Sequence, residues 1–100
     1  MEHEEIIYEI NYTKQFKKDY KKYRNNLKKV EKITNVIQLL EKGGVENIPQ
    51  SMKPHFLIGN YQGHLECHIE SDLLIIWLQY DEENKKIVLV RLGSHSELFK

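Results

Sequence analysis

The strongest constraint on the fold is an unbroken apolar run, LLIIWLQY at residues 73–80, which short connections separate from further extended segments. Such a run is too uniformly apolar for a sheet edge, so we expect a central strand that helices cover on one face. Further strands are predicted at 55–60, 64–70 and 86–92. Because connections this short join only antiparallel neighbours, the second half of the chain predicts an antiparallel sheet of three or four strands.

The first half of the chain has a helical period. Asn25-Asn26 indicates a break between two helices, Thr13 or Asn11 is a candidate cap for the first, and Gly43-Gly44 ends the second. A short strand is expected before them, at residues 6–10. This order predicts a compact α+β domain spanning residues 1–100. The two expected apolar stripes are Tyr12, Phe16, Tyr20, Tyr23 and Leu27, then Leu27, Val30, Ile33, Ile37 and Leu40.

Composition excludes several classes of protein. The only cysteine, Cys67, cannot form an intrachain disulfide, and the absence of a CxxC motif leaves no thiolate zinc site. No apolar run approaches the roughly 20 residues that cross a bilayer, and the acidic start MEHEE does not resemble a secretory signal. We therefore expect a cytoplasmic protein with no membrane partner.

The net charge of zero conceals a segregation of charge. Residues 1–10 carry four acids and no Lys or Arg, residues 12–32 carry nine bases and two acids, and residues 33–100 carry six bases and nine acids. The basic segment could attract phosphate, although lysines are also common on solvated helix faces. The candidate phosphate contacts are Lys14, Lys17, Lys18, Lys21, Lys22, Arg24, Lys28 and Lys29.

Strand parity predicts a polar sheet face that carries histidines. In the segment HLECHIE, alternate side chains point to opposite faces of the sheet. Beyond the last strand, Gly93 permits a turn, and one helical turn would align His95 with Phe99. The apolar set Leu65, Cys67 and Ile69 is expected to face the helices, and the set His64, Glu66, His68 and Glu70 to face water or a ligand.

Three motifs, PHFLIGNY, ECHIESD and RLGSHSELF, resemble the RelE/ParE superfamily of bacterial toxins, and within it the YafQ-like mRNA interferases. The resemblance covers nearly the whole chain. It implies a ribosome-dependent endoribonuclease that cuts mRNA at the decoding site, needs no metal or cofactor, and is neutralised by a cognate antitoxin. The basic helices would then contact ribosomal RNA. Functional residues of the family fall on His55, His68, Asp72, His95 and Phe99, with Arg91 a further candidate.

The chemistry of RNA cleavage without a metal fits these residue types. The 2′-hydroxyl attacks the phosphorus, a base takes its proton, an acid protonates the departing 5′-oxygen, and a cation stabilises the phosphorane. Imidazole, with an unperturbed pKa of about 6.5, can act as base or acid near neutrality. Arg91 could supply positive charge and Phe99 could stack on a base, while His64, which shares strand parity with His68, is a second-rank candidate for substrate binding.

Structural explanations exist for the same residues. Asp72 could simply bond its own backbone in the Ser71-Asp72 turn, and Phe99 could cover the end of the core. Arg91 could form a salt bridge with Glu66 or Glu70. His68 could be an ordinary polar residue of a strand face. Trp77, in the central strand, is expected in the core.

Two positions depart from the family pattern, and two other functions stay open. Relatives often have Trp where this chain has Leu73, and Arg near Leu65, which implies weaker stacking and less charge here.

One alternative is a non-catalytic ParE-like toxin or binding module that inhibits its target without cleaving RNA. The other is a metal hydrolase, although no HExxH motif exists. Its ligands would be His55, His68, Asp72 and His95.

Overall fold

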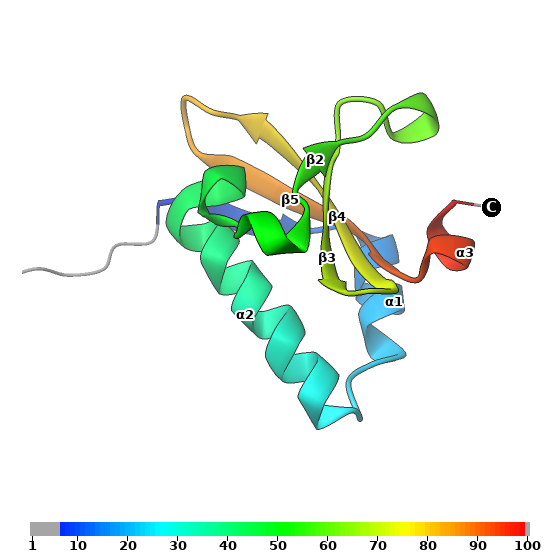
Figure 1. Ribbon diagram of the computed structural model, residues 1–100. Helices are drawn as coiled ribbons and strands as arrows, with labels where there is room; N and C mark the ends of the chain where they lie inside the picture. The colour runs from blue at the N-terminus through cyan, green and yellow to red at the C-terminus, as the bar shows by residue number, and fades with distance from the viewer. Residues whose placement is uncertain (1–6, 100) are drawn as a thin grey trace, which may run out of the picture.

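A five-stranded sheet with the strand order β1-β5-β4-β3-β2 organises the computed structural model, which describes residues 7–99 (Figure 1). All neighbouring strands are antiparallel except β1 and β5, which pair in parallel. The predicted α+β order is confirmed. The elements are β1 (Glu9–Tyr12), α1 (Lys14–Lys21), α2 (Leu27–Gly43), β2 (His55–Phe56), β3 (Leu65–Glu70), β4 (Leu73–Asp81), β5 (Lys86–Gly93) and α3 (His95–Leu98), with short 3₁₀ turns at Gly44–Asn47, Gln50–Met52 and Gly59–Tyr61.

Two strand boundaries differ from those predicted. The first strand was expected at 6–10, where Ile6 lies outside the described residues, but pairing with β5 covers Glu9–Tyr12. The backbone N–H groups of Ile7 and Tyr8 donate instead to the carbonyl of Glu41 at the end of α2. The strand expected at 55–60 is only two residues long, because the chain turns into the 3₁₀ turn at Gly59–Tyr61.

The helix boundaries follow the capping residues. The side chain of Thr13 accepts the backbone N–H of Phe16 to begin α1, and the side chain of Asn26 accepts that of Lys29 to begin α2. Helix α2 ends before Gly44, whose φ of 64° lies in the left-handed region. The apolar stripes were only partly right, since Leu27 is 80% exposed and Val36 is buried. Because a turn separates α1 from α2, the buried face of α2 does not have to continue the buried face of α1.

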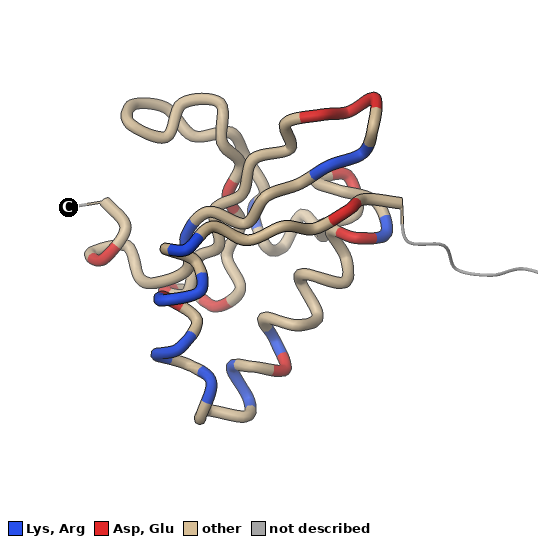
Figure 2. Tube along the Cα trace, turned by 180° about the vertical axis from the view of Figure 1, so that it is seen from behind, with Lys and Arg blue, Asp and Glu red and all other residues tan. Residues whose placement is uncertain are grey.

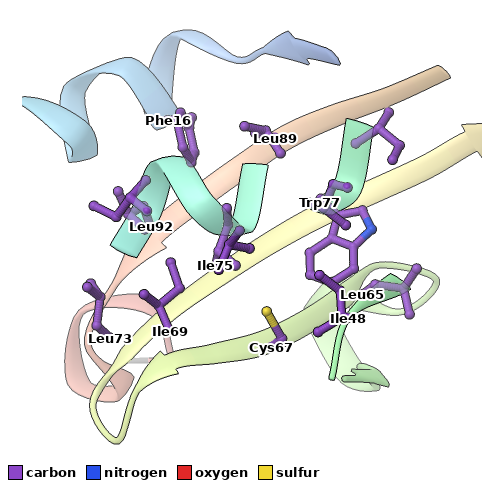
Figure 3. Packing of buried hydrophobic residues seen from close by; sticks show 14 of the residues in the cluster. Phe16, Ile48, Leu65, Cys67, Ile69, Leu73, Ile75, Trp77, Leu89 and Leu92 are labelled. Atoms are coloured by element: carbon purple, nitrogen blue, oxygen red, sulfur yellow. The ribbon is translucent and has the colours of Figure 1, made fainter. Parts of the chain in front are cut away.

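The main core lies between the sheet and helices α1 and α2 (Figure 3). Phe16 of α1 packs near Leu92, and Trp77 is buried in the centre of the sheet, as predicted. Leu65, Cys67 and Ile69 of β3 face this core, which agrees with their parity.

A second, smaller core covers the other face of the sheet, where the sequence predicted a polar surface. Leu74 and Ile76 of β4 are buried there beneath Leu98 of α3. Partly buried Leu57 and Tyr61, from the segment after β2, pack against them. Strand β4 is therefore covered on both faces, which explains why its sequence is apolar at successive positions.

Helix α1 completes the outer edge of β5. Strand β1 ends opposite Leu89, and beyond that point the Thr13 hydroxyl donates to the Val90 carbonyl at 3.0 Å. The N–H of Leu92 donates to the buried Asp19 carboxylate at 2.9 Å. These bonds fix α1 beside the part of β5 that leads into α3.

Candidate active site

The rings of His68 and His95 meet at the end of the sheet, with centroids 5.9 Å apart. His68 lies on β3, and His95 is the first residue of α3, which follows β5 directly. Ser94 and Glu97 form a capping box that holds the start of α3. Two imidazoles separated by 27 positions along the chain thus share one surface.

Asp72, in the turn between β3 and β4, binds the same helix start. Its Oδ1 accepts the backbone N–H of His95 at 3.0 Å and lies 3.6 Å from Nδ1 of that residue's ring. Asp72 therefore bonds across to α3 instead of to its own backbone. This contact orients the His95 ring and leaves Nε2 on the opposite side of the imidazole.

His55 and Glu66 form a second pair of polar side chains in this region, although Glu66 was predicted to face water or a ligand. Nδ1 of His55 lies 2.7 Å from the Lys53 carbonyl, and Nε2 of His55 lies 3.2 Å from Oε1 of Glu66. A carbonyl can only accept, so Nδ1 carries a proton. The ring Nε2 then faces the Glu66 carboxyl group.

Glu66 is only 2% exposed, and its Oε2 has no hydrogen-bond partner among residues 7–99. Burial raises the pKa of Glu66, and the nearby charges of His55, His68 and His95 oppose that shift. Of the three candidate catalytic imidazoles, that of His55 lies in direct contact with this carboxyl group, at 3.2 Å. A buried carboxyl group of raised pKa beside titrating side chains is typical of sites that move protons.

Tyr61 connects the remaining candidates. Its ring lies edge-on to those of Phe99 and His64, with centroids 5.8 Å and 5.7 Å away. Its hydroxyl accepts a hydrogen bond from Nη1 of Arg91 at 3.3 Å. Phe99 also lies 5.8 Å from the ring of His95 and remains 41% exposed, so it does not simply cover the core.

Arg91 has a partner that the sequence did not suggest. Its Nε donates to Oδ2 of Asp19 at 2.8 Å, so the pair is not formed with Glu66 or Glu70. Burial raises the pKa of Asp19, but hydrogen bonds from Arg91, Leu92 and Gln15 outweigh that effect and lower it overall. Glu70 is bound instead by Lys29 and Lys32.

Sequence reasoning missed three residues of this region. Tyr61 lies in the motif PHFLIGNY, and Glu66 shares parity with His68, so both carried a signal. Asp19 is one of only two acids in the basic segment, and that isolation is the sole sign of its role.

Basic residues follow one another along α1 and the first turns of α2 (Figure 2). Of the predicted phosphate contacts, Lys22 pairs with Glu97 at 3.5 Å and Lys29 with Glu70. The Lys22 pair places the end of α1 beside α3, so the basic surface adjoins the histidines.

The distribution of metal-ligating side chains bears on the chemistry. No three His, Cys, Asp or Glu side chains within residues 7–99 are grouped so as to hold a metal ion. Across the same residues, none of the helices has the length and apolar character that a bilayer crossing requires.

This strand order, with two helices on one face and a third after β5, defines a RelE/ParE-type toxin fold. A YoeB/ParE toxin from Agrobacterium tumefaciens has the same fold, with a TM-score of 0.74 at 18% identity over 87% of this chain and 98% of that one. Residues 8–100 match the family described as bacterial toxin of type II toxin-antitoxin system, YafQ. The chain belongs to this family.

Individual relatives agree with the assignment. The mRNA interferase toxin YafQ of Escherichia coli K12 is 30% identical over 91 residues, which are 91% of this chain and 95% of that protein. The crystal structure of YafQ from E. coli BL21(DE3) aligns with a TM-score of 0.81 at 28% identity, covering 93% and 99% of the two chains. YafQ in the E. coli DinJ-YafQ toxin-antitoxin complex aligns at 0.78 and 29% identity, covering 95% and 100%.

Proposed function

We propose that the chain is a ribosome-dependent mRNA endoribonuclease that uses histidine and carboxylate side chains for metal-independent acid-base chemistry. The observation that carries this proposal is the convergence of His68 and His95, 5.9 Å apart, with Asp72 bound to the backbone of His95. The E. coli relative named mRNA interferase supports RNA as the substrate.

The hydrogen bonds favour one division of the proton transfers. Asp72 lies near Nδ1 of His95, which leaves the lone pair of Nε2 to take the proton from the 2′-hydroxyl. The 2′-oxygen then bonds to phosphorus and the bond from phosphorus to the 5′-oxygen breaks. The His55–Glu66 pair holds a proton next to the site and delivers it to the leaving 5′-oxygen. His68, beside His95, stabilises the charge of the phosphorane.

Substrate positioning involves the aromatic residues. Phe99 offers an exposed ring for stacking on a base, an interaction worth about 1–3 kcal/mol in single-stranded recognition. Arg91 and His64 flank Tyr61 and would act mainly by holding that surface in place.

The test is primer extension on translated mRNA with wild type, His95→Ala and His68→Ala. We expect each substitution to reduce cleavage by about 10²-fold or more, and wild-type cleavage to persist in excess chelator. Equal cleavage by all three proteins would refute the catalytic assignment. Cleavage that the chelator abolishes would favour the metal hydrolase.

The alternative is a ParE-like toxin that does not cut RNA. Growth arrest with intact mRNA, undiminished by His95→Gln, would favour it. Inhibition of DNA supercoiling would then identify the class of target.

A cognate antitoxin is the expected partner, because the E. coli relative is found in a DinJ-YafQ toxin-antitoxin complex. An acidic segment would shield the basic surface of α1 most easily. Both partners and the ribosome would meet in the cytoplasm. Co-expression of a small acidic protein from a neighbouring reading frame should restore growth, and purification should recover both chains together.

A further inference from the structure

The candidate active site needs a cation for its phosphate groups, but the basic residues around it are neutralised. Arg91 is bound to Asp19 and Tyr61. Lys22 is paired with Glu97. Lys29 and Lys32 both bind Glu70. A phosphodiester entering the site would compete with these carboxylates for each of them.

A cavity of about 400 Å³ opens beside His68 and contains a lysine without such a partner. The ammonium group of Lys53 forms no ion pair with any other side chain of residues 7–99, and the residue is exposed. Ser51 and Ser71 line the same cavity, and their hydroxyl groups can donate hydrogen bonds, while Met52 adds apolar surface.

The acid in this cavity does not oppose an anion. Glu70 lines it, but hydrogen bonds from Lys29 and Lys32 lower the pKa of Glu70 and balance its charge. The cavity therefore has a net excess of positive charge at Lys53, within a size range common for ligand sites.

We propose that this cavity binds the nucleotide next to the scissile bond, with Lys53 on its phosphate and the two serine hydroxyls as further donors. The inference rests on the proposed endoribonuclease function and adds a substrate subsite to it. His68 belongs to both places: it faces His95 on one side and lines the cavity with Lys53. One RNA strand can thus run from the cavity to the catalytic imidazoles.

Lys53 also has a backbone role that a substitution must preserve. Its φ is 55° and its carbonyl accepts Nδ1 of His55 at 2.7 Å. Asn is well tolerated in this left-handed conformation, so Lys53→Asn removes the charge and keeps the carbonyl in place. Lys53→Arg retains the charge and serves as the matched variant.

The first experiment measures cleavage of a translated mRNA at increasing toxin concentration. Loss of a charge-assisted hydrogen bond predicts that Lys53→Asn lowers kcat/KM about tenfold to a hundredfold. The contact exists before and during the reaction, so kcat should stay within about threefold of wild type. Lys53→Arg retains the charge and should recover most of the kcat/KM that Lys53→Asn loses, and all three proteins should melt at similar temperatures.

The second experiment removes the charge from the RNA. An uncharged methylphosphonate replaces the phosphate on one side or the other of the scissile bond. At one of these two positions the methylphosphonate should slow cleavage by wild type. At the same position it should not slow cleavage by Lys53→Asn beyond the loss that the substitution already causes. Lys85→Gln changes an exposed lysine outside the cavity and outside the predicted phosphate contacts, so its effect should add to that of the methylphosphonate.

The outcomes separate the two proposals. Additive effects of Lys53→Asn and methylphosphonate at both flanking positions, with an active wild type, would overturn the subsite alone. A wild type that leaves the unmodified mRNA intact would overturn the endoribonuclease function, and the subsite with it.

Discussion

Arg91 of β5 donates its Nε hydrogen to Oδ2 of Asp19 on α1 at 2.8 Å. The same carboxylate oxygen accepts the backbone N–H of Leu92 at 2.9 Å. One carboxylate of the basic helix therefore fixes both the backbone and a side chain of the strand that leads into α3. The position of His95 relative to β3 depends on this contact.

Asp19→Asn should therefore destabilise the fold. Removing one partner of a buried ion pair costs about 3–5 kcal/mol, and we expect the lower end because Arg91 keeps 22% of its side chain exposed. Urea unfolding measures this change in stability. Asp81→Asn changes a half-buried acid at the end of β4 whose side-chain hydrogen bonds stay within its turn, so its unfolding midpoint should stay near that of wild type. An unchanged midpoint for Asp19→Asn would contradict this account.

Asp72→Asn should separate two roles of Asp72: the hydrogen bond that orients His95 and the negative charge beside the His95 ring. An asparagine oxygen can still accept the N–H of His95, but it removes the negative charge 3.6 Å from Nδ1. We expect cleavage to fall at least tenfold, which is less than the roughly 10²- to 10⁴-fold that complete loss of acid-base catalysis costs, without a loss of stability. Asp72→Ala also removes the hydrogen bond and should be worse. Equal activity of wild type and Asp72→Asn would exclude an electrostatic role.

Glu66→Gln should raise stability at neutral pH and lower activity. The pKa of Glu66 is raised by burial, so the folded state binds this proton more tightly than the unfolded state does. The contribution of Glu66 to wild-type stability therefore falls as pH rises from the ordinary value of 4.5 through the raised folded value. Thermal melting between pH 4 and pH 8 checks this. The advantage of Glu66→Gln should be small at the acid end and grow with pH; a constant difference would mean that burial does not set the pKa of this carboxyl.

The strand pattern predicted the centre of the sheet better than its edges. Leu65, Cys67 and Ile69 all face the main core, as alternation predicts, although the pairing of β3 with β4 shifts register between His68 and Glu70. In β5 the alternation fails at a bulge: Trp77 pairs with Leu89 and Ile76 with Arg91, which leaves Val90 between them. No residue type marks a bulge of this kind, so parity alone could not place Leu89 in the core.

The site was predictable where chain order was enough. Strands β3 and β5 both flank β4, and the ends that carry His68 and the start of α3 lie together in that order. The burial of Glu66 was not predictable from the alternation of β3, because it depends on a contact with His55 on the neighbouring strand β2. The Arg91–Asp19 pair joins residues 72 positions apart and depends on how α1 crosses β5.

Cys67 should be inert in the folded protein. Burial, with a smaller contribution from Glu66, raises the pKa of the Cys67 thiol to about 12. Since the thiolate is the reactive species, alkylation at pH 8 should be negligible until urea unfolds the chain. Rapid labelling of the native protein would show that β3 opens away from the helices.

Removal of charge from α1 should weaken ribosome binding in a salt-dependent way. Lys17 and Lys21 belong to α1 and are exposed. Every phosphate that a lysine no longer neutralises should reduce the slope of log affinity against log salt by roughly 0.7–0.9. The double variant Lys17→Gln/Lys21→Gln is compared with Lys85→Gln/Lys86→Gln, which removes equal charge where the β4–β5 turn enters β5. Co-sedimentation with ribosomes over a range of KCl concentrations gives both slopes. A reduced slope for the first pair alone assigns the α1 lysines to RNA phosphates. A slope for Lys17→Gln/Lys21→Gln equal to that of wild type would mean that these lysines only solvate the helix.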